Sequence, residues 1–281
     1  MPAPERKLTD WLQLCRSAVA DVEVVLGRLP TRTEREPVVG TGRGGDETTA
    51  IDRAAEEAIL ARVEAAAGAV VSEEVGRVGA GALPLVVVDP IDGSLNAKRG
   101  IPFFSLSIAV AEGETMDDVV FGFVHDFGSR EEWTARRGEG AWRNGDPLGA
   151  VRPKDAVEIL SFEATRTSLV ARDAPKVAEL AHRLRIMGSL ALSLCHLAAG
   201  RVDAVCSLKP ARSVDIAAAQ LLCRELGLAV DLFDVEEPFG AAPLDLEQRS
   251  RVVAAGSDAV CDRISAALRG DALDSPSRAN A

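Results

Sequence analysis

Residues 85–94 read Leu85-Val86-Val87-Val88-Asp89-Pro90-Ile91-Asp92-Gly93-Ser94, an apolar, β-branched run that stops at two aspartates. The run predicts a buried strand, and we expect Pro90, which lacks an N–H group, to end its pairing. Gly93 tolerates backbone angles that other residues resist, which lets N–H groups approach a ligand. Two carboxylates beside free amides and a hydroxyl suit a hard divalent cation next to a phosphate. The alternative is an ordinary turn.

Acids stand at the ends of three further elements. A short apolar run at 69–71 precedes Ser72-Glu73-Glu74, whose two glutamates point to opposite sides of an extended chain. Asp52 falls in the first turn of a helix with an apolar face at positions 51, 55, 59 and 63, and Asp215 begins a helix that continues to about residue 226. Taken singly, the two glutamates fit a solvated turn at least as well as a metal site. Asp52 and Asp215 likewise fit ordinary acids at a helix start.

Together and in this order, the segments resemble the signatures of the inositol monophosphatase superfamily. Its members are magnesium-dependent, lithium-sensitive phosphatases and include fructose-1,6-bisphosphatases and 3′-phosphoadenosine 5′-phosphate phosphatases. The resemblance covers nearly the whole chain and implies an α/β fold, a layered αβαβα sandwich of the sugar phosphatase type. The segments that resemble the family's motifs are Asp-Pro-Ile-Asp-Gly-Ser-x-Asn at 89–96, Thr-x-x-Asp at 49–52, Ser-Glu-Glu at 72–74, Gly-x-Gly-Ala-x-x-Asn-Gly at 138–145, and residues 188–191 with 199–204.

The resemblance implies two or three Mg²⁺ ions as cofactors. The metal ligands it implies are Glu73, Glu74 in support, Asp89, the Ile91 carbonyl, Asp92 and Asp215. These residues are all carboxylates apart from Ile91, and oxygen ligands are those that Mg²⁺ prefers.

The remaining implied roles concern the phosphate and the attacking water. Gly93 and Ser94 would offer backbone amides to the phosphate, and the Ser94 hydroxyl would orient a water together with Glu73. Asp52 would hold Thr49 or Ser94 in place through a hydrogen bond. The further residues expected at the substrate are Gly188, Ser189 and Arg212.

Two departures separate the chain from the animal enzymes of the superfamily. Val214 stands where those enzymes have Trp, and Leu208 stands where they have a Glu that binds inositol hydroxyls. The sequence around them looks closer to the archaeal-type branch, in which sugar bisphosphate and inositol phosphate activities occur together. Lys209 and Arg212 are candidates for holding a second phosphate, and solvated loop charges are the alternative.

Composition limits the partners and the compartment. The net charge of −11 argues against nucleic acid, because a phosphate backbone attracts a basic surface. The longest apolar runs fall short of a membrane span, so we expect no membrane partner. Five scattered cysteines without a Cys-x-x-Cys pair predict buried thiols in a reducing cytoplasm. The family resemblance adds an expected homodimer.

Hydrophobic patterning predicts two parts. Residues 1–149 would form an α+β domain with most metal ligands, starting with an amphipathic helix whose apolar face runs from Leu8 to Leu26. Residues 150–281 would form an α/β domain that closes the cleft, and the tail 270–281 would be disordered. In the second part we expect strands at 157–161, 185–187, 202–207 and 252–255, helices at 177–184, 190–199, 214–226 and 257–268, and a loop at 236–246.

The function predicted from these observations is hydrolysis of a small phosphorylated polyol or sugar, such as inositol monophosphate or fructose 1,6-bisphosphate, by a metal-activated water. A 3′(2′),5′-bisphosphate nucleotidase is the first alternative. It is less favoured because an adenine site benefits from stacking, whereas the chain has no Tyr and only 4% aromatic residues. A non-catalytic metal-binding homologue is the second.

Overall fold

The computed structural model describes residues 10–79, 81, 83–151, 154, 156–164 and 166–270. The expected start of the first helix at Leu8 and the expected disorder beyond residue 270 lie outside the described residues. Within that part, no helix is long and apolar enough to cross a membrane.

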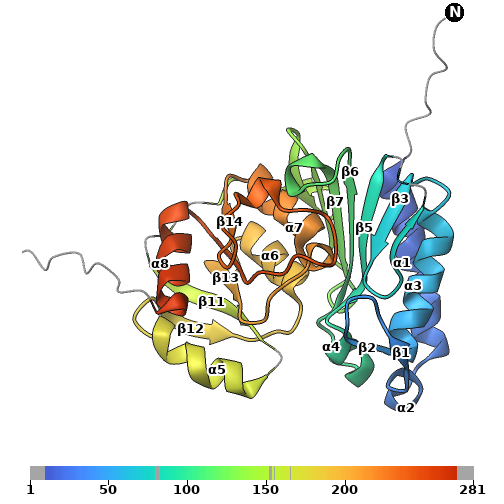
Figure 1. Cartoon of the computed structure of the whole chain (residues 1–281), viewed down its shortest axis with the longest axis horizontal. Helices are drawn as coiled ribbons and strands as arrows, with labels where there is room; N and C mark the ends of the chain where they lie inside the picture. Colours follow the sequence, from blue (N-terminus) through green and yellow to red (C-terminus); the bar gives the residue numbers. More distant parts are fainter. Residues whose placement is uncertain are drawn as a thin grey trace, which may run out of the picture.

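An eight-stranded sheet forms the larger half, in the spatial order β10-β9-β8-β7-β6-β5-β3-β4. All its neighbours pair antiparallel except β3 and β5. Helices α1 and α3 cover one face (Figure 1) and share a hydrophobic core with it. The strands are β3 (Ala69–Ser72), β4 (Gly76–Gly79), β5 (Leu85–Asp92), β6 (Ser105–Ala111), β7 (Val119–Asp126), β8 (Glu132–Arg136), β9 (Gly140–Arg143) and β10 (Asp146–Pro147). The helices are α1 (Trp11–Arg28) and α3 (Ala50–Val63).

Shorter elements surround this sheet near the ends of its central strands. An antiparallel hairpin precedes α3, and a short helix follows β5 directly. These elements are α2 (Arg32–Arg35), β1 (Val38–Thr41), β2 (Glu47–Thr49), α4 (Ser94–Arg99) and the 3₁₀ turn η1 (Met116–Asp118).

A five-stranded sheet forms the other half, in the order β12-β11-β13-β15-β14. Its first three strands run parallel, and β15 is antiparallel to both of its neighbours. The strands are β11 (Val157–Glu163), β12 (Ala181–Arg185), β13 (Ala204–Ser207), β14 (Ala229–Leu232) and β15 (Val252–Ala255). The helical elements are α5 (Thr167–Asp173), α6 (Leu190–Ala198), α7 (Ser213–Glu225), α8 (Asp258–Arg269), η2 (Ala174–Val177) and η3 (Phe239–Ala241).

Helices α6 and α7 lie between the two sheets, whereas α5 and α8 lie on the far side of the smaller sheet (Figure 1). The five layers are therefore helix, sheet, helix, sheet, helix, which confirms the predicted αβαβα sandwich. One hydrophobic core draws residues from both sheets and from the two helices between them. The division at residue 149 falls after β10 and stays a prediction.

The prediction that Pro90 ends the strand is wrong. β5 pairs with β6 from Leu85↔Ala111 to Asp89↔Ser107 and resumes at Asp92↔Ser105 after an irregularity. Proline removes only its own N–H, and a bulge accommodates that loss while the strand continues. The carboxylates of Asp89 and Asp92 are therefore held by sheet backbone on both sides of the proline.

The predicted helix at 177–184 is also wrong. This stretch contains the end of the 3₁₀ turn η2 and the start of β12, which already ends at Arg185. The expected strand at 185–187 thus begins earlier, and the helix of this region is α5, further upstream. β12 is an edge strand with mostly exposed side chains, so it lacks the alternating apolar pattern that marks a half-buried strand.

All five cysteines are buried free thiols, as predicted. They lie in α1, α6, β13, α7 and α8, at Cys15, Cys195, Cys206, Cys223 and Cys261.

Candidate active site

An acidic cleft of about 260 Å³ lies between the two halves of the molecule, at the ends of β5, β11 and β13. Its walls come from the end of β5, the start of α4, the segment after β3, the end of β11 and the start of α7. Three cations also line it, Lys98, Lys209 and Arg212. The nine carboxylates of the lining are Asp46, Glu47, Asp52, Glu73, Glu74, Asp89, Asp92, Glu163 and Asp215. The structure thus brings together the acids that the sequence indicated in separate segments.

The end of β5 places two of these acids and the phosphate-binding candidates. Asp89 accepts a hydrogen bond from the Ile91 N–H at 3.1 Å, and the Ser94 hydroxyl donates to the Ile91 carbonyl at 2.9 Å. Gly93 adopts a φ of 96°, and a Cβ there would lie 3.1 Å from the carbonyls of Phe103 and Gly188. Only glycine therefore lets the chain turn from β5 into α4 at this point.

Asp92 joins the two halves of the molecule. Its carboxylate accepts the Ser189 hydroxyl at 2.5 Å and the Ala191 N–H at 2.7 Å, at the start of α6. Gly188, with a φ of 90°, donates its N–H to Glu163 at 2.7 Å. The predicted substrate residues Gly188 and Ser189 thus lie beside a predicted metal ligand.

The predicted pair Thr49 and Asp52 is in contact. Asp52 accepts the Thr49 N–H at 3.0 Å and its hydroxyl at 2.5 Å, which caps α3. The other Asp52 oxygen is buried and has no hydrogen-bond partner among the described residues. The Thr48 hydroxyl donates to Glu74, so the hairpin β1–β2 supports that acid.

Two further acids have roles that the sequence analysis missed. Glu56 accepts the Ser72 hydroxyl at 2.5 Å and the N–H groups of Glu74 and Val75 at 3.1 and 3.2 Å, which fixes the turn that carries Glu73. Glu163 holds the turn before α6 in a similar way. Glu56 follows Asp52 by one helical turn, and that spacing is the sequence signal for an inward-facing acid.

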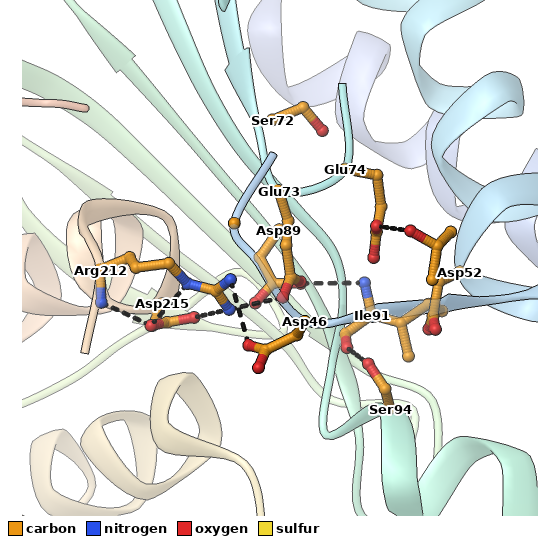
Figure 2. A network of polar contacts seen from close by, with 12 residues as sticks. Asp46, Asp52, Ser72, Glu73, Glu74, Asp89, Ile91, Ser94, Arg212 and Asp215 are labelled. Atoms are coloured by element: carbon orange, nitrogen blue, oxygen red, sulfur yellow. Dashed lines mark hydrogen bonds and ion pairs between the residues drawn. The ribbon is translucent and has the colours of Figure 1, made fainter. Parts of the chain in front are cut away.

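Arg212 lies among the carboxylates (Figure 2). Its guanidinium is 2.5 Å from Glu73, 3.2 Å from Asp215 and 3.6 Å from Asp46, and its side chain is only 7% exposed. The backbone N–H of Arg212, the N-cap residue of α7, also donates to Asp215 at 2.6 Å. A Cβ at Gly44 would lie 2.2 Å from the Arg212 Nη1, so this glycine leaves room for the guanidinium.

Burial of several acids in one place raises their pKa values. The pKa of Glu73 is raised to about 7 by burial and by the neighbouring Asp215 and Glu74. Burial raises the pKa of Asp92 to about 7, and that of Asp89 lies well above its usual range. For Glu73 this effect of burial outweighs the positive charge of Arg212, which acts in the opposite direction, and buried carboxylates of this kind fit a site for hard cations.

The carboxylates do not already surround one point. In the described part of the chain, no three Asp, Glu, His or Cys side chains converge as a metal-binding group. The guanidinium of Arg212 instead lies between Glu73 and Asp215 (Figure 2).

The layered fold and the acidic cleft between its two halves are those of the metal-dependent phosphatases of small phosphorylated molecules. The model of the inositol monophosphatase family matches residues 10–270, and the chain belongs to this family. A fructose-1,6-bisphosphatase/inositol-1-monophosphatase of Thermococcus kodakarensis is 33% identical over 78% of this chain and 82% of the relative.

Further relatives agree with the archaeal-type branch. A protein of the same description from Archaeoglobus fulgidus is 32% identical over 88% of this chain and 93% of its own length. A solved inositol monophosphatase–fructose 1,6-bisphosphatase matches with a TM-score of 0.78 and 28% identity, covering 92% of this chain and 99% of the other. Family, branch and fold are therefore as predicted.

Proposed function

We propose that the protein is a phosphomonoesterase that hydrolyses a small phosphorylated sugar or polyol. The observation that carries this proposal is the cleft itself, in which buried carboxylates face the N–H groups that open α4. An acidic cleft cannot attract a phosphate ester by itself, but bound cations reverse the local sign of charge. Because the phosphatases of this family depend on metal, we infer that bound metal ions supply the missing positive charge.

The metal that best suits these donors is Mg²⁺, in two or three copies. Its ligands in this proposal are Glu73, Asp89, the Ile91 carbonyl, Asp92 and Asp215, with Glu74 supported by Thr48. Bound Mg²⁺ polarises phosphoryl oxygens and lowers the pKa of a coordinated water.

The protein's own groups position the substrate and the water. Gly93 and Ser94 present N–H groups to the phosphoryl oxygens, and Gly188 lines the cleft beside Gly93. Ser189 is buried behind it and supports Asp92 through its hydroxyl. The Ser94 hydroxyl and Glu73 orient the water, and the Asp52–Thr49 pair fixes the start of α3 beside them.

The specific substrates in this proposal are fructose 1,6-bisphosphate and inositol monophosphate. Archaeal relatives carry both names. Leu208 is buried and offers no acceptor for an inositol hydroxyl, whereas Lys209 stands on the cleft wall. Among the described residues that line the cleft none is aromatic, which favours a sugar over a nucleotide.

We also infer a homodimer and a cytoplasmic location. The family resemblance supports the dimer, and the five buried free thiols suit a reducing compartment.

The test is hydrolysis of a panel of inositol 1-phosphate, fructose 1,6-bisphosphate and 3′-phosphoadenosine 5′-phosphate with Mg²⁺ and with a chelator. Asp89→Asn keeps the shape of the side chain and should lower kcat at least ~100-fold. Asp231→Asn, on β14 and outside the cleft, is the matched control. Full activity of the Asp89 variant, or activity that survives chelation, would contradict the proposal.

A further inference from the structure

The half of the molecule that contains the five-stranded sheet contributes two carboxylates to the described lining of the acidic cleft, Glu163 and Asp215. Asp215 pairs with Arg212 at 3.2 Å and is a proposed metal ligand. Glu163 ends β11, is only 6% exposed, and has hydroxyl and N–H groups rather than cations as its hydrogen-bond partners in the described part of the chain. It is therefore a buried carboxylate in the cleft that the proposed metal site does not use.

The two carboxylate oxygens of Glu163 differ in how many donors surround them. Oε1 lies 2.7 and 2.8 Å from the hydroxyls of Ser161 and Ser193, and 3.3 Å from the Met187 N–H. Within the described residues, Oε2 accepts a single hydrogen bond, from the Gly188 N–H at 2.7 Å. Because each carboxylate oxygen offers about two acceptor sites, Oε2 can accept one further donor.

One turn of backbone connects this acceptor with the proposed phosphate site. A Cβ at Gly93 would lie 3.1 Å from the Gly188 carbonyl, and the N–H of the same Gly188 donates to Glu163. The Asn96 side chain donates to the Met187 carbonyl at 2.7 Å, so the larger half of the molecule holds this turn from its other side. The turn therefore fixes the separation between Gly93 and the Glu163 carboxylate.

The chemistry of this part of the wall favours a hydroxyl group as the further donor. A carboxylate repels a phosphate, whereas a hydroxyl donates one hydrogen bond and so matches the one remaining acceptor site. Hydrogen bonds from hydroxyls to carboxylates are short and strong because the acceptor is charged. Leu208, whose N–H donates to the Glu163 carbonyl at 2.8 Å, is buried and has no polar side-chain atom to compete for the hydroxyl.

We propose that Glu163 determines substrate specificity by accepting a hydrogen bond from a hydroxyl on the carbon next to the one that carries the phosphate. This inference rests on the proposed function and deepens it, because it defines the substrate class as esters with a neighbouring hydroxyl. An ester without this hydroxyl leaves part of a buried charge without a partner, and a site built for a hydroxyl rejects such an analogue.

The first experiment compares two esters that differ only by this group, 2-hydroxycyclohexyl phosphate and cyclohexyl phosphate, in the presence of Mg²⁺. For the parent protein, kcat/KM should be at least about tenfold higher for the hydroxylated ester. In Glu163→Gln this ratio should fall about tenfold, because a neutral amide accepts a weaker hydrogen bond than a carboxylate.

Inositol 1-phosphate in the same assay distinguishes failure of this inference from failure of the proposed function. Equal turnover of the two cyclohexyl esters by the parent protein, or no turnover of the hydroxylated one, would overturn the inference. Hydrolysis of inositol 1-phosphate would then leave the proposed function standing. If none of the three esters reacts, both are wrong.

The matched control is Glu47→Gln, which removes the same charge from the lining of the cleft. Glu47 lies exposed on β2, outside the turn at residues 187–189. Its ratio of kcat/KM values should equal that of the parent protein. If Glu163→Gln instead slows both cyclohexyl esters in equal proportion, Glu163 only supports the turn and the proposal is wrong.

Calorimetric titration with Mg²⁺ separates hydroxyl binding from metal binding. The affinities of Glu163→Gln and Glu47→Gln for Mg²⁺ should be similar, because each variant loses one negative charge from the cleft. An affinity about tenfold lower for Glu163→Gln than for Glu47→Gln would make Glu163 a metal ligand and overturn the proposal.

Discussion

At the scale of single residues, Arg212 has the largest consequences. It is the buried cation nearest to Glu73 and Asp215, and both of these acids are proposed metal ligands. A guanidinium that pairs with a carboxylate competes with a metal for the same charge. Arg212 therefore stabilises the metal-free cleft and weakens its affinity for cations.

We predict opposite effects of Arg212→Gln on two quantities. The free energy of unfolding of the chelated protein should fall by about 3 kcal/mol, because acids remain buried without their partner. The affinity for Mg²⁺ should rise at least about tenfold, since a positive charge leaves the site. Thermal denaturation with chelator and calorimetric titration with Mg²⁺ measure the two.

Lys209→Gln is the control, because it removes the same charge from an exposed pair with Asp46. Its effects on both quantities should be small. Weaker Mg²⁺ binding by the Arg212 variant would show instead that Arg212 orients the ligands.

Ser94 offers a second test at this scale. Ser94→Ala removes the hydroxyl but keeps the backbone N–H at the start of α4. We predict a fall in kcat much larger than any change in KM, because orientation of a water matters mainly in the transition state. Steady-state kinetics measure both, and a raised KM with unchanged kcat would make Ser94 a binding residue.

At the scale of elements, the close approach of α7 to the large sheet depends on a glycine. A Cβ at Gly122 in β7 would lie 2.5 Å from the Ala218 carbonyl of α7. The backbone of the helix therefore rests directly on the strand. Asp215 lies at the start of the same helix, so this contact also fixes where the acid enters the cleft.

Gly122→Ala should destabilise the protein by about 1–3 kcal/mol, because α7 must move away from β7. Gly27→Ala is the matched control. Gly27 lies in α1 and a Cβ there meets nothing within 4 Å, so alanine should be neutral or stabilising by up to about 1 kcal/mol. Denaturant unfolding of both variants measures the difference, and equal stabilities would show that α7 adapts freely.

The sequence predicts elements well where one pattern dominates. The buried strands of the large sheet and the helices α6, α7 and α8 follow from apolar runs and helical periodicity. The hairpin β1–β2 and the edge strand β12 carry polar or exposed residues, and tertiary pairing decides their structure. The same distinction holds for the acids. Local motifs predict the acids of the cleft, whereas Glu56 and Glu163 accept hydrogen bonds from backbone N–H groups that only the folded chain brings near.

At the scale of the whole molecule, the buried acids make stability depend on pH. The pKa values of Glu73 and Asp92 are raised to about 7 in the folded state by burial, whereas in the unfolded chain they are near 4. Between these values the folded chain binds protons that the unfolded chain has lost. The stability of the metal-free protein must therefore fall as pH rises through this window.

We predict that the Tm of the chelated protein is lower at pH 8 than at pH 5. Saturating Mg²⁺ at pH 8 should restore much of the difference, because cations bind the folded state and compensate its acids. Scanning calorimetry at both pH values, with and without Mg²⁺, measures this. A Tm in chelator that rises from pH 5 to pH 8 would exclude the raised pKa values.

The buried thiols can report on how the protein unfolds. Because the five cysteines are distributed over α1, β13, α6, α7 and α8, each of the five layers except the large sheet carries its own probe. Burial raises the pKa of Cys261 to about 12 and those of the other four still further, so an alkylating reagent reacts only with a layer that has come apart. Mass spectrometry of briefly alkylated protein would thus record the order in which the layers separate, without any engineered label.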